Sequence, residues 1–181
     1  MKKNKISKNW VNKQRRDIYV RQSKVDGYRA RSAYKLIEIN EKFKILKNGI
    51  SVIDLGAAPG SWSQYSSKIV KNGRIVSIDL KEMESIDQTT QIQGDFTDPK
   101  YKNKIKELFN TKVEVVLSDM AVNTTGIKNI DAIYTGELCK EAMNFSQEIL
   151  SINGFFVSKI FMGGTFNQII ADAKSKFKDV K

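Results

Sequence analysis

Short apolar runs recur along the chain, and amphipathic stretches separate them. The runs are rich in β-branched residues, are short enough for buried strands, and cover 50–55, 74–79, 90–93, 113–118 and 155–160. The stretches between them place apolar residues at helical spacing and predict helices over 31–44, 61–71, 98–109, 131–151 and 164–177. Strands that alternate with helices predict an α/β fold, with a mostly parallel sheet covered by helices on both faces.

Capping and turn residues mark several of these boundaries. Ser32 is a candidate cap at the start of the first helix, and Asp98-Pro99 opens another. Asn72-Gly73 ends the helix over 61–71, and Asn153-Gly154 is predicted to turn into the last strand. We expect residues 16–30 to form a loop with a short helix, and residues 1–15 to be mobile.

Composition narrows the class of protein. The 181 residues are enough for one domain with a real core. No apolar run approaches a membrane span, and the basic start has no apolar stretch behind it, so we expect a cytoplasmic chain with no membrane association. One cysteine excludes an internal disulfide, and the absence of histidine excludes Ser-His-Asp catalysis and histidine-based metal sites. We predict no metal site and expect a monomer.

Positive charge is concentrated at one end. Residues 1–50 hold 15 Lys and Arg against 4 Asp and Glu, whereas residues 51–181 hold 16 of each kind. This segregation favours a polyanion partner, although a solvated tail or a membrane-surface patch would also carry it. Aromatic residues alternate with the arginines, which suits RNA because bases can stack on the rings; they are Trp10, Tyr19, Tyr28 and Tyr34, among Arg15, Arg16, Arg21, Arg29 and Arg31.

A glycine-containing loop joins the first strand to the helix over 61–71. It runs Val52-Ile-Asp-Leu-Gly-Ala-Ala-Pro-Gly-Ser61, followed by Trp62. Gly56 and Gly60 lack a Cβ, so the chain can turn sharply and lie against a cofactor. The spacing is neither a Walker A loop nor Gly-x-Gly-x-x-Gly. It is similar to the first loop of S-adenosylmethionine-dependent methyltransferases, and Trp62 would either belong to the core or wall the methionine part of the cofactor.

Acidic residues stand at the ends of four predicted strands. Because ligands of such folds bind outside the carboxyl ends of the strands, these acids are candidate cofactor ligands; they are Asp54, Asp79, Asp95 and Asp119. Asp79 is placed to accept hydrogen bonds from ribose hydroxyls, and Asp95 to reach an adenine amino group. Each acid alone would be an ordinary cap or turn residue, but four beside one glycine loop favour a cofactor site.

Two lysines lie among apolar residues. Lys159 falls inside the predicted strand 155–160, where an ammonium group is costly to bury unless it is paired or used. Its place near the carboxyl end of that strand puts it beside Asp119. Lys35 lies within Ala33-Tyr-Lys-Leu-Ile37 of the first helix, and on sequence alone it would be solvated.

Together these motifs resemble those of the FtsJ/RrmJ family of ribosomal RNA 2′-O-methyltransferases. The resemblance runs from about residue 10 to Lys181, and the motifs occur in the right order; they are Tyr28–Leu36, Asp54–Gln64, Gly94-Asp-Phe96, Leu117–Ala121 and Lys159-Ile-Phe161. It implies a Rossmann-like methyltransferase fold, S-adenosylmethionine as cofactor, and a 2′-O-methylated uridine in large-subunit ribosomal RNA as product. The RNA substrate would lie in an assembled or assembling subunit.

The resemblance also implies roles for individual residues. Gly60, Trp62, Asp79, Asp95 and Asp119 would bind the cofactor, beside Asp54 and Gly56 of the same loop. Lys35, Asp119 and Lys159 would be three members of a catalytic Lys-Asp-Lys-Glu set, with Lys159 as proton acceptor. We therefore expect one domain over 1–181, in which 1–34 is a basic RNA-binding segment and 35–181 is the catalytic core.

The fourth member of that set has no counterpart. In the family it is a Glu in a C-terminal strand region, and here neither that Glu nor the last two strands can be found before Lys181. We expect the sequence to be C-terminally incomplete, because a fifth strand without neighbours would expose a long apolar edge. Two other functions stay open: methylation of transfer RNA or of another ribosomal RNA site, and a non-catalytic RNA-binding assembly factor that keeps the cofactor pocket.

Overall fold

One parallel sheet forms the centre of the molecule. The computed structural model describes residues 17–121 and 125–181. Its strands are β1 (Ser51–Leu55), β2 (Arg74–Asp79), β3 (Thr89–Gln93), β4 (Val113–Ser118) and β5 (Leu150–Ser158). They pair in the order β3-β2-β1-β4-β5, and every pair is parallel. The predicted α/β class is confirmed.

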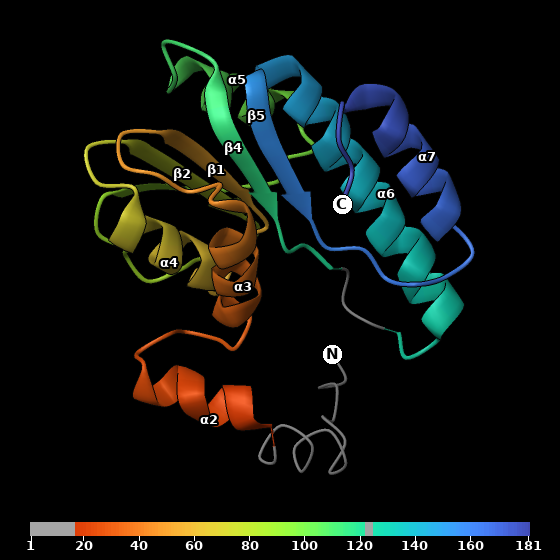
Figure 1. The fold of residues 1–181 in the computed structure, drawn as a ribbon, viewed down its shortest axis with the longest axis horizontal. Helices are drawn as coiled ribbons and strands as arrows, with labels where there is room; N and C mark the ends of the chain where they lie inside the picture. Colours follow the sequence, from red (N-terminus) through yellow and green to blue (C-terminus); the bar gives the residue numbers. More distant parts are fainter. Residues whose placement is uncertain (1–16, 122–124) are drawn as a thin grey trace.

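Helices cover both faces of this sheet (Figure 1). One face carries α3 (Ala33–Phe43) and α4 (Ser61–Ile69), and the other carries α5 (Pro99–Glu107) and α6 (Lys128–Ile149). Outside α6 lies α7 (Phe166–Lys176). A short helix, α2 (Ile18–Val25), lies beyond the sheet on the side to which β4 and β5 point their carboxyl ends.

Alternating side chains join the strands to these two helical layers. In β1, Val52 packs with Leu36 and Trp62 on the α3–α4 face, whereas Ile53 packs with Phe145 on the α5–α6 face. Each of these side chains is buried. The period of two in a strand sends neighbouring residues to opposite faces, which is why a continuous apolar run marks a strand covered on both sides.

The junction between α6 and β5 differs from the prediction. The helix begins at Lys128 instead of 131 and ends at Ile149, and the strand follows at once from Leu150 instead of 155. Leu150 pairs with Val113 and Phe155 with Val115, so the residues between form a bulge. Asn153 has a left-handed φ of 64° there. The Asn-Gly pair therefore bends the strand and is not the turn before it.

Predictions for single residues have mixed outcomes. Ser32 is the N-cap residue of α3, as predicted, although its side chain makes no capping hydrogen bond. Lys159 lies one residue beyond the end of β5 and not within it, with its backbone N–H donating to the Ser118 carbonyl at 2.9 Å. The predicted short helix within 16–30 is confirmed as α2, which Asp17 caps by accepting from the Tyr19 N–H. The predicted mobile segment 1–15 lies outside the described residues.

The layer between α6 and α7 is a small separate core. Cys139, Met143 and Ile169 are buried there. Burial raises the pKa of the Cys139 thiol, so this side chain is not an accessible nucleophile. Among the helices of the described part of the chain, none combines the length and apolar character that crossing a bilayer requires.

Candidate functional site

Three of the predicted acids meet at the carboxyl edge of the central strands. Asp54 lies in β1, Asp79 ends β2 and Asp119 follows β4, and β1 pairs with both β2 and β4. Parallel strands bring their carboxyl ends to one edge, so these residues become neighbours although they are far apart in the sequence. The order of the strands thus assembles the candidate site.

Asp54 is the most deeply buried of them. Its side chain is 1% exposed and accepts a hydrogen bond of 2.6 Å from the Ser63 hydroxyl, which also lies 2.6 Å from the Ser77 hydroxyl. Burial raises the pKa of Asp54 to about 7, and the negative charges of Asp119 and Asp79 act in the same direction. Asp54 therefore anchors the turn from inside the protein.

Asp79 is held by backbone groups on both sides. Its Oδ2 accepts from the Ala58 N–H at 2.9 Å, and its Oδ1 accepts from the Lys81 N–H at 2.8 Å. Each carboxylate oxygen keeps a second lone pair, so further hydroxyl donors can still bind. This carboxylate joins the loop after β1 to the loop after β2.

Both glycines of the loop after β1 are required by the fold itself. Gly56 and Gly60 have left-handed φ values of 69° and 104°. A Cβ on Gly56 would lie 2.0 Å from the Met120 Cγ, and one on Gly60 would lie 2.9 Å from Arg29 Nη1. Side chains of the chain itself therefore fill the space beside these glycines.

Trp62 is a core residue that also borders the candidate site. It is 4% exposed within the core of the α3–α4 face, and its indole N–H donates to the Ser32 carbonyl at 2.8 Å. It also lines a small recess that contains two of the acids; the lining is Ser32, Asp54, Gly56, Ala57, Ala58, Trp62 and Asp119. Gly56 of the predicted cofactor set lies in the same recess, whereas Gly60 and Asp79 adjoin it.

The two predicted lysines converge on Asp119. Lys159 Nζ lies 2.9 Å from Asp119 Oδ1, and Lys35 Nζ lies 3.6 Å from the same oxygen. The Lys159 ammonium donates a hydrogen bond to the Asp119 carbonyl at 2.5 Å, while Asp119 Oδ1 is buried and accepts no aligned hydrogen bond. Residues from α3, from the end of β4 and from the end of β5 thus form one charged cluster.

Asp95 lies apart from this cluster. It follows β3, two positions outward from β1 in the sheet, and its Oδ1 accepts from the N–H and the hydroxyl of Thr97. Its observed contacts are those of a turn residue before α5. The structure does not bring it into the lining of the recess.

Sequence reasoning missed several supporting side chains. Ser63 and Ser77 are fully buried partners around Asp54, and the polar Ser77 within an apolar strand was the available signal. The side chain of Arg29 spans two loops at the site, although in the sequence it looks like one more basic residue of the N-terminal segment. Contacts of this kind depend on which loops become neighbours, and the local pattern does not contain that information.

The residues present fit S-adenosylmethionine. Its hydroxyl groups suit the open lone pairs of Asp79, and the recess beside that carboxylate is lined by the acids Asp54 and Asp119. Asp119 Oδ1 is buried and already faces the two lysine ammonium groups. A larger apolar hollow of about 560 Å³ lies along β5 and α7, among Phe156, Ile169 and Phe177, and contains none of the predicted site residues. Within the described residues, no group of three His, Cys, Asp or Glu side chains is arranged to hold a metal ion.

Known proteins match this chain over most of its length. The family model described as FtsJ-like methyltransferase matches residues 28–181. The protein named ribosomal RNA large subunit methyltransferase E of Pelagibacter ubique (strain HTCC1062) is 74% identical over 181 residues, covering 100% of this chain and 89% of that relative. The protein of the same name from Rickettsia akari (strain Hartford) is 43% identical, covering 97% of this chain and 80% of the relative.

Solved structures agree with this picture. A crystal structure described as a putative ribosomal RNA methyltransferase from Plasmodium falciparum has a TM-score of 0.78 and 32% identity, covering 85% of this chain and 90% of that one. A methyltransferase of mycinamycin biosynthesis, solved with Mg, SAH and mycinamycin VI, has a TM-score of 0.52 and 15% identity, covering 80% of this chain and 35% of that one. The second likeness concerns the fold alone.

Proposed function

Because the chain belongs to the FtsJ-like methyltransferase family, we propose that it methylates the ribose 2′-hydroxyl of a uridine in large-subunit ribosomal RNA. The chain is a methyltransferase of this family, and relatives that bear the name of a large-subunit ribosomal RNA methyltransferase match it over 97–100% of its length. The choice of a uridine and the roles of individual residues are part of the proposal.

The cofactor site in this proposal is the carboxyl edge of β1, β2 and β4. Asp79 would accept hydroxyl groups of the cofactor, and Asp119 with the loop after β1 would hold its cationic part. Gly56, Gly60 and Trp62 would shape the loop, with Asp54 fixed beneath it through Ser63. Asp95 accepts a hydrogen bond from the Thr97 hydroxyl in the turn after β3, and it would contact the cofactor from that end of the sheet.

One observation carries the catalytic assignment: two lysines lie within 2.9 and 3.6 Å of one oxygen of Asp119. When bound, S-adenosylmethionine supplies a methyl group on a positively charged sulfur. Lys159 would accept the proton of the ribose 2′-hydroxyl, for which its amine must be unprotonated at the moment of attack. Lys35 would stay charged and orient the ribose, and Asp119 would hold both amines in place.

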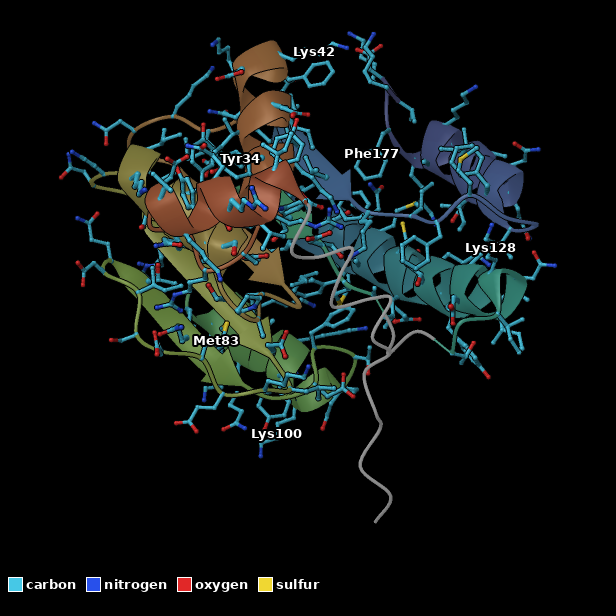
Figure 2. All side chains as sticks on the ribbon, turned by 90° about the horizontal axis from the view of Figure 1, so that it is seen from below. Tyr34, Lys42, Met83, Lys100, Lys128 and Phe177 are labelled. Carbon is cyan, nitrogen blue, oxygen red and sulfur yellow. The ribbon has the colours of Figure 1, made fainter. Side chains whose placement is uncertain are left out.

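The RNA would be held by the basic segment over 1–34. Its described part carries an aromatic cluster beside positive charge: the Tyr34 ring lies 5.4 Å from that of Tyr19 and 5.9 Å from that of Tyr28. Lys68 Nζ lies 4.0 Å from the centre of the Tyr28 ring. Figure 2 shows Tyr34 where α2 meets α3, the helix that carries Lys35. Trp10, Arg15 and Arg16 of this segment lie outside the described residues.

Replacing Lys159 tests the catalytic assignment. We expect Lys159→Ala to reduce methyl transfer at least about 100-fold, because the proton acceptor is lost, while cofactor affinity changes little. The measurement is transfer of labelled methyl from S-adenosylmethionine to large subunits that lack the modification, with mapping of the labelled nucleotide. Retained turnover in this variant would remove Lys159 from the role of base.

Asp79→Asn is the converse variant for the same assay. It leaves the lysines and Asp119 in place, so its main effect should be weaker cofactor binding.

The labelled product of the unaltered protein tests the proposed substrate. Label on a base, on transfer RNA alone, or on no RNA despite tight cofactor binding would each contradict it. Label on a ribose 2′-oxygen of the large subunit would support it.

A further inference from the structure

The guanidinium group of Arg29 bridges two loops at the candidate site. Nη1 donates to the Pro59 carbonyl at 3.1 Å and to the Glu84 carbonyl at 2.8 Å, and Nη2 donates to the Ser85 carbonyl at 2.8 Å. Pro59 belongs to the loop after β1, and Glu84 and Ser85 belong to the loop after β2. These are the two loops that Asp79 also joins, through the N–H groups of Ala58 and Lys81.

This contact is not a surface ion pair. The Arg29 side chain is 18% exposed, and the one carboxylate near it, that of Glu84, is 94% exposed and 4.0 Å away. An exposed pair of that kind contributes little, whereas three carbonyl acceptors use the planar fork of the guanidinium. The fit is close, because a Cβ on Gly60 would come within 2.9 Å of Arg29 Nη1.

Other bonds attach the same N-terminal segment to the helix after the glycine loop. The Arg29 N–H donates to Gln64 Oε1 at 3.1 Å, and Gln64 Nε2 donates to the Gly27 carbonyl at 2.7 Å. The Trp62 indole donates to the Ser32 carbonyl. Residues 27–32, which precede Lys35 in the chain, are therefore built onto the start of α4. They are attached to the fold and are not a free arm.

We propose that Arg29 is a positioning residue for the cofactor: by fixing the loop after β1 against the loop after β2, it sets the affinity for S-adenosylmethionine. The inference rests on the proposed function. It assigns to cofactor binding a basic residue that charge alone would give to RNA. Arg29 touches neither Lys159 nor Asp119 in the structure, so its effect passes through the two loops.

A lysine at this position separates geometry from charge. Lys has one ammonium at the end of a flexible stem, which cannot satisfy carbonyls of two loops in the fixed plane that a guanidinium offers. Arg29→Lys therefore keeps the charge and loses the bridge, and Arg29→Gln loses both. Arg31→Gln is the matched control, because Arg31 lies on the same segment but pairs with Asp17, away from both loops.

The test is the equilibrium dissociation constant of the full chain for S-adenosylhomocysteine, measured by calorimetry well below each variant's melting temperature. We expect Arg29→Lys and Arg29→Gln to raise this constant about tenfold or more, and Arg31→Gln to change it less than about twofold. In methyl transfer, Arg29→Lys should raise the KM for S-adenosylmethionine while kcat at saturating cofactor stays within about threefold. If Arg29→Gln does not fold, Arg29→Lys alone decides.

Two results would overturn the inference. One is an Arg29→Lys protein that folds and binds S-adenosylhomocysteine as tightly as the parent. The other is an Arg29→Lys protein whose kcat falls while its KM for S-adenosylmethionine is unchanged. That result would indicate that Arg29 acts on the RNA substrate and not on the cofactor. A parent protein that binds no S-adenosylhomocysteine would instead overturn the proposed function, so the two failures are distinguishable.

Discussion

Asp54 is a carboxyl group that the fold keeps from water beneath the glycine loop. Its hydrogen bond comes from Ser63, and Asp79 and Asp119 lie near enough to disfavour a third negative charge. An ionised Asp54 therefore costs free energy in the ligand-free protein, and protonation relieves that cost. The carboxyl group that fixes the turn therefore also makes the stability of the protein depend on pH.

We expect the contribution of Asp54 to stability to fall as pH rises from about 4 to about 7. The pKa of Asp54 is raised from 3.8 to about 7 by folding, so within this window the folded chain keeps a proton that the unfolded chain has released. Its contribution is present below pH 3.8 and is lost as pH rises through about 7, with a size on the order of a few kcal/mol. Urea unfolding at a series of pH values measures it.

Asp54→Asn provides the reference, because an amide of nearly the same shape cannot titrate. Other acids change charge in the same range, so the informative quantity is the difference between the parent and this variant. That difference should slope between pH 4 and 7 and flatten above it. Parallel curves for the two proteins would show that Asp54 ionises freely in the fold.

For single residues, the sequence predicts which side chains lie at the site, but not which groups they contact. The positions of Asp54, Asp79 and Asp119 followed from strand ends, because parallel strands bring those ends together. The contacts of Arg29 and Gln64 did not follow, since each depends on a loop that lies 30 or more residues away in the chain. The sequence around Lys35 predicts a solvated side chain, and the structure shows it 54% exposed but with its Nζ 3.6 Å from Asp119 Oδ1.

At the scale of elements, boundaries that rest on a capping side chain were predictable. Asp98-Pro99 was expected to open a helix, and α5 begins at Pro99 with Asp98 accepting from the Lys100 N–H at 2.8 Å. The boundary between α6 and β5 was not predictable in the same way. Asn153-Gly154 commonly forms a turn, and only pairing with β4 makes it a bulge within a strand.

Asp98→Ala should lower the free energy of unfolding by about 1 kcal/mol, because it removes the cap of α5. The first turn of this helix also contains Lys100 and no acidic residue, so the charge of Asp98 has no substitute there. Chemical unfolding gives the change. Asp98→Asn keeps an acceptor at the cap and should retain most of the stability, and equal losses in both variants would point to charge instead of capping.

At the scale of the whole molecule, the order of strands and helices was readable from the sequence because each apolar run is bounded by a turn signal. The arrangement of charge was equally readable, with the whole excess of +11 in residues 1–50. The described part of that segment does not stand free of the fold, since residues 27–32 are bonded to α4. Charge alone could not reveal this attachment.

Binding to RNA should weaken steeply with salt. Release of counterions makes the logarithm of affinity fall linearly with that of salt concentration, and several phosphate contacts give a loss of about 100-fold or more between about 50 and 200 mM. Filter binding with a ribosomal RNA fragment measures the slope. Neutralising Lys13 and Lys24 together should reduce that slope, whereas neutralising Lys104 and Lys174 should leave it unchanged. If the affinity of the unaltered protein for RNA does not change with salt, the basic segment 1–34 does not bind RNA through its charge.

The outer edge of β5 pairs with no further strand in the described part of the chain, and Ile152, within β5, is 94% exposed. An unpaired strand edge is a template on which another strand can pair. Whatever segment pairs along this edge of β5 would therefore extend the sheet and bury the exposed side of that strand. The solubility of the protein thus depends on how this one edge is covered.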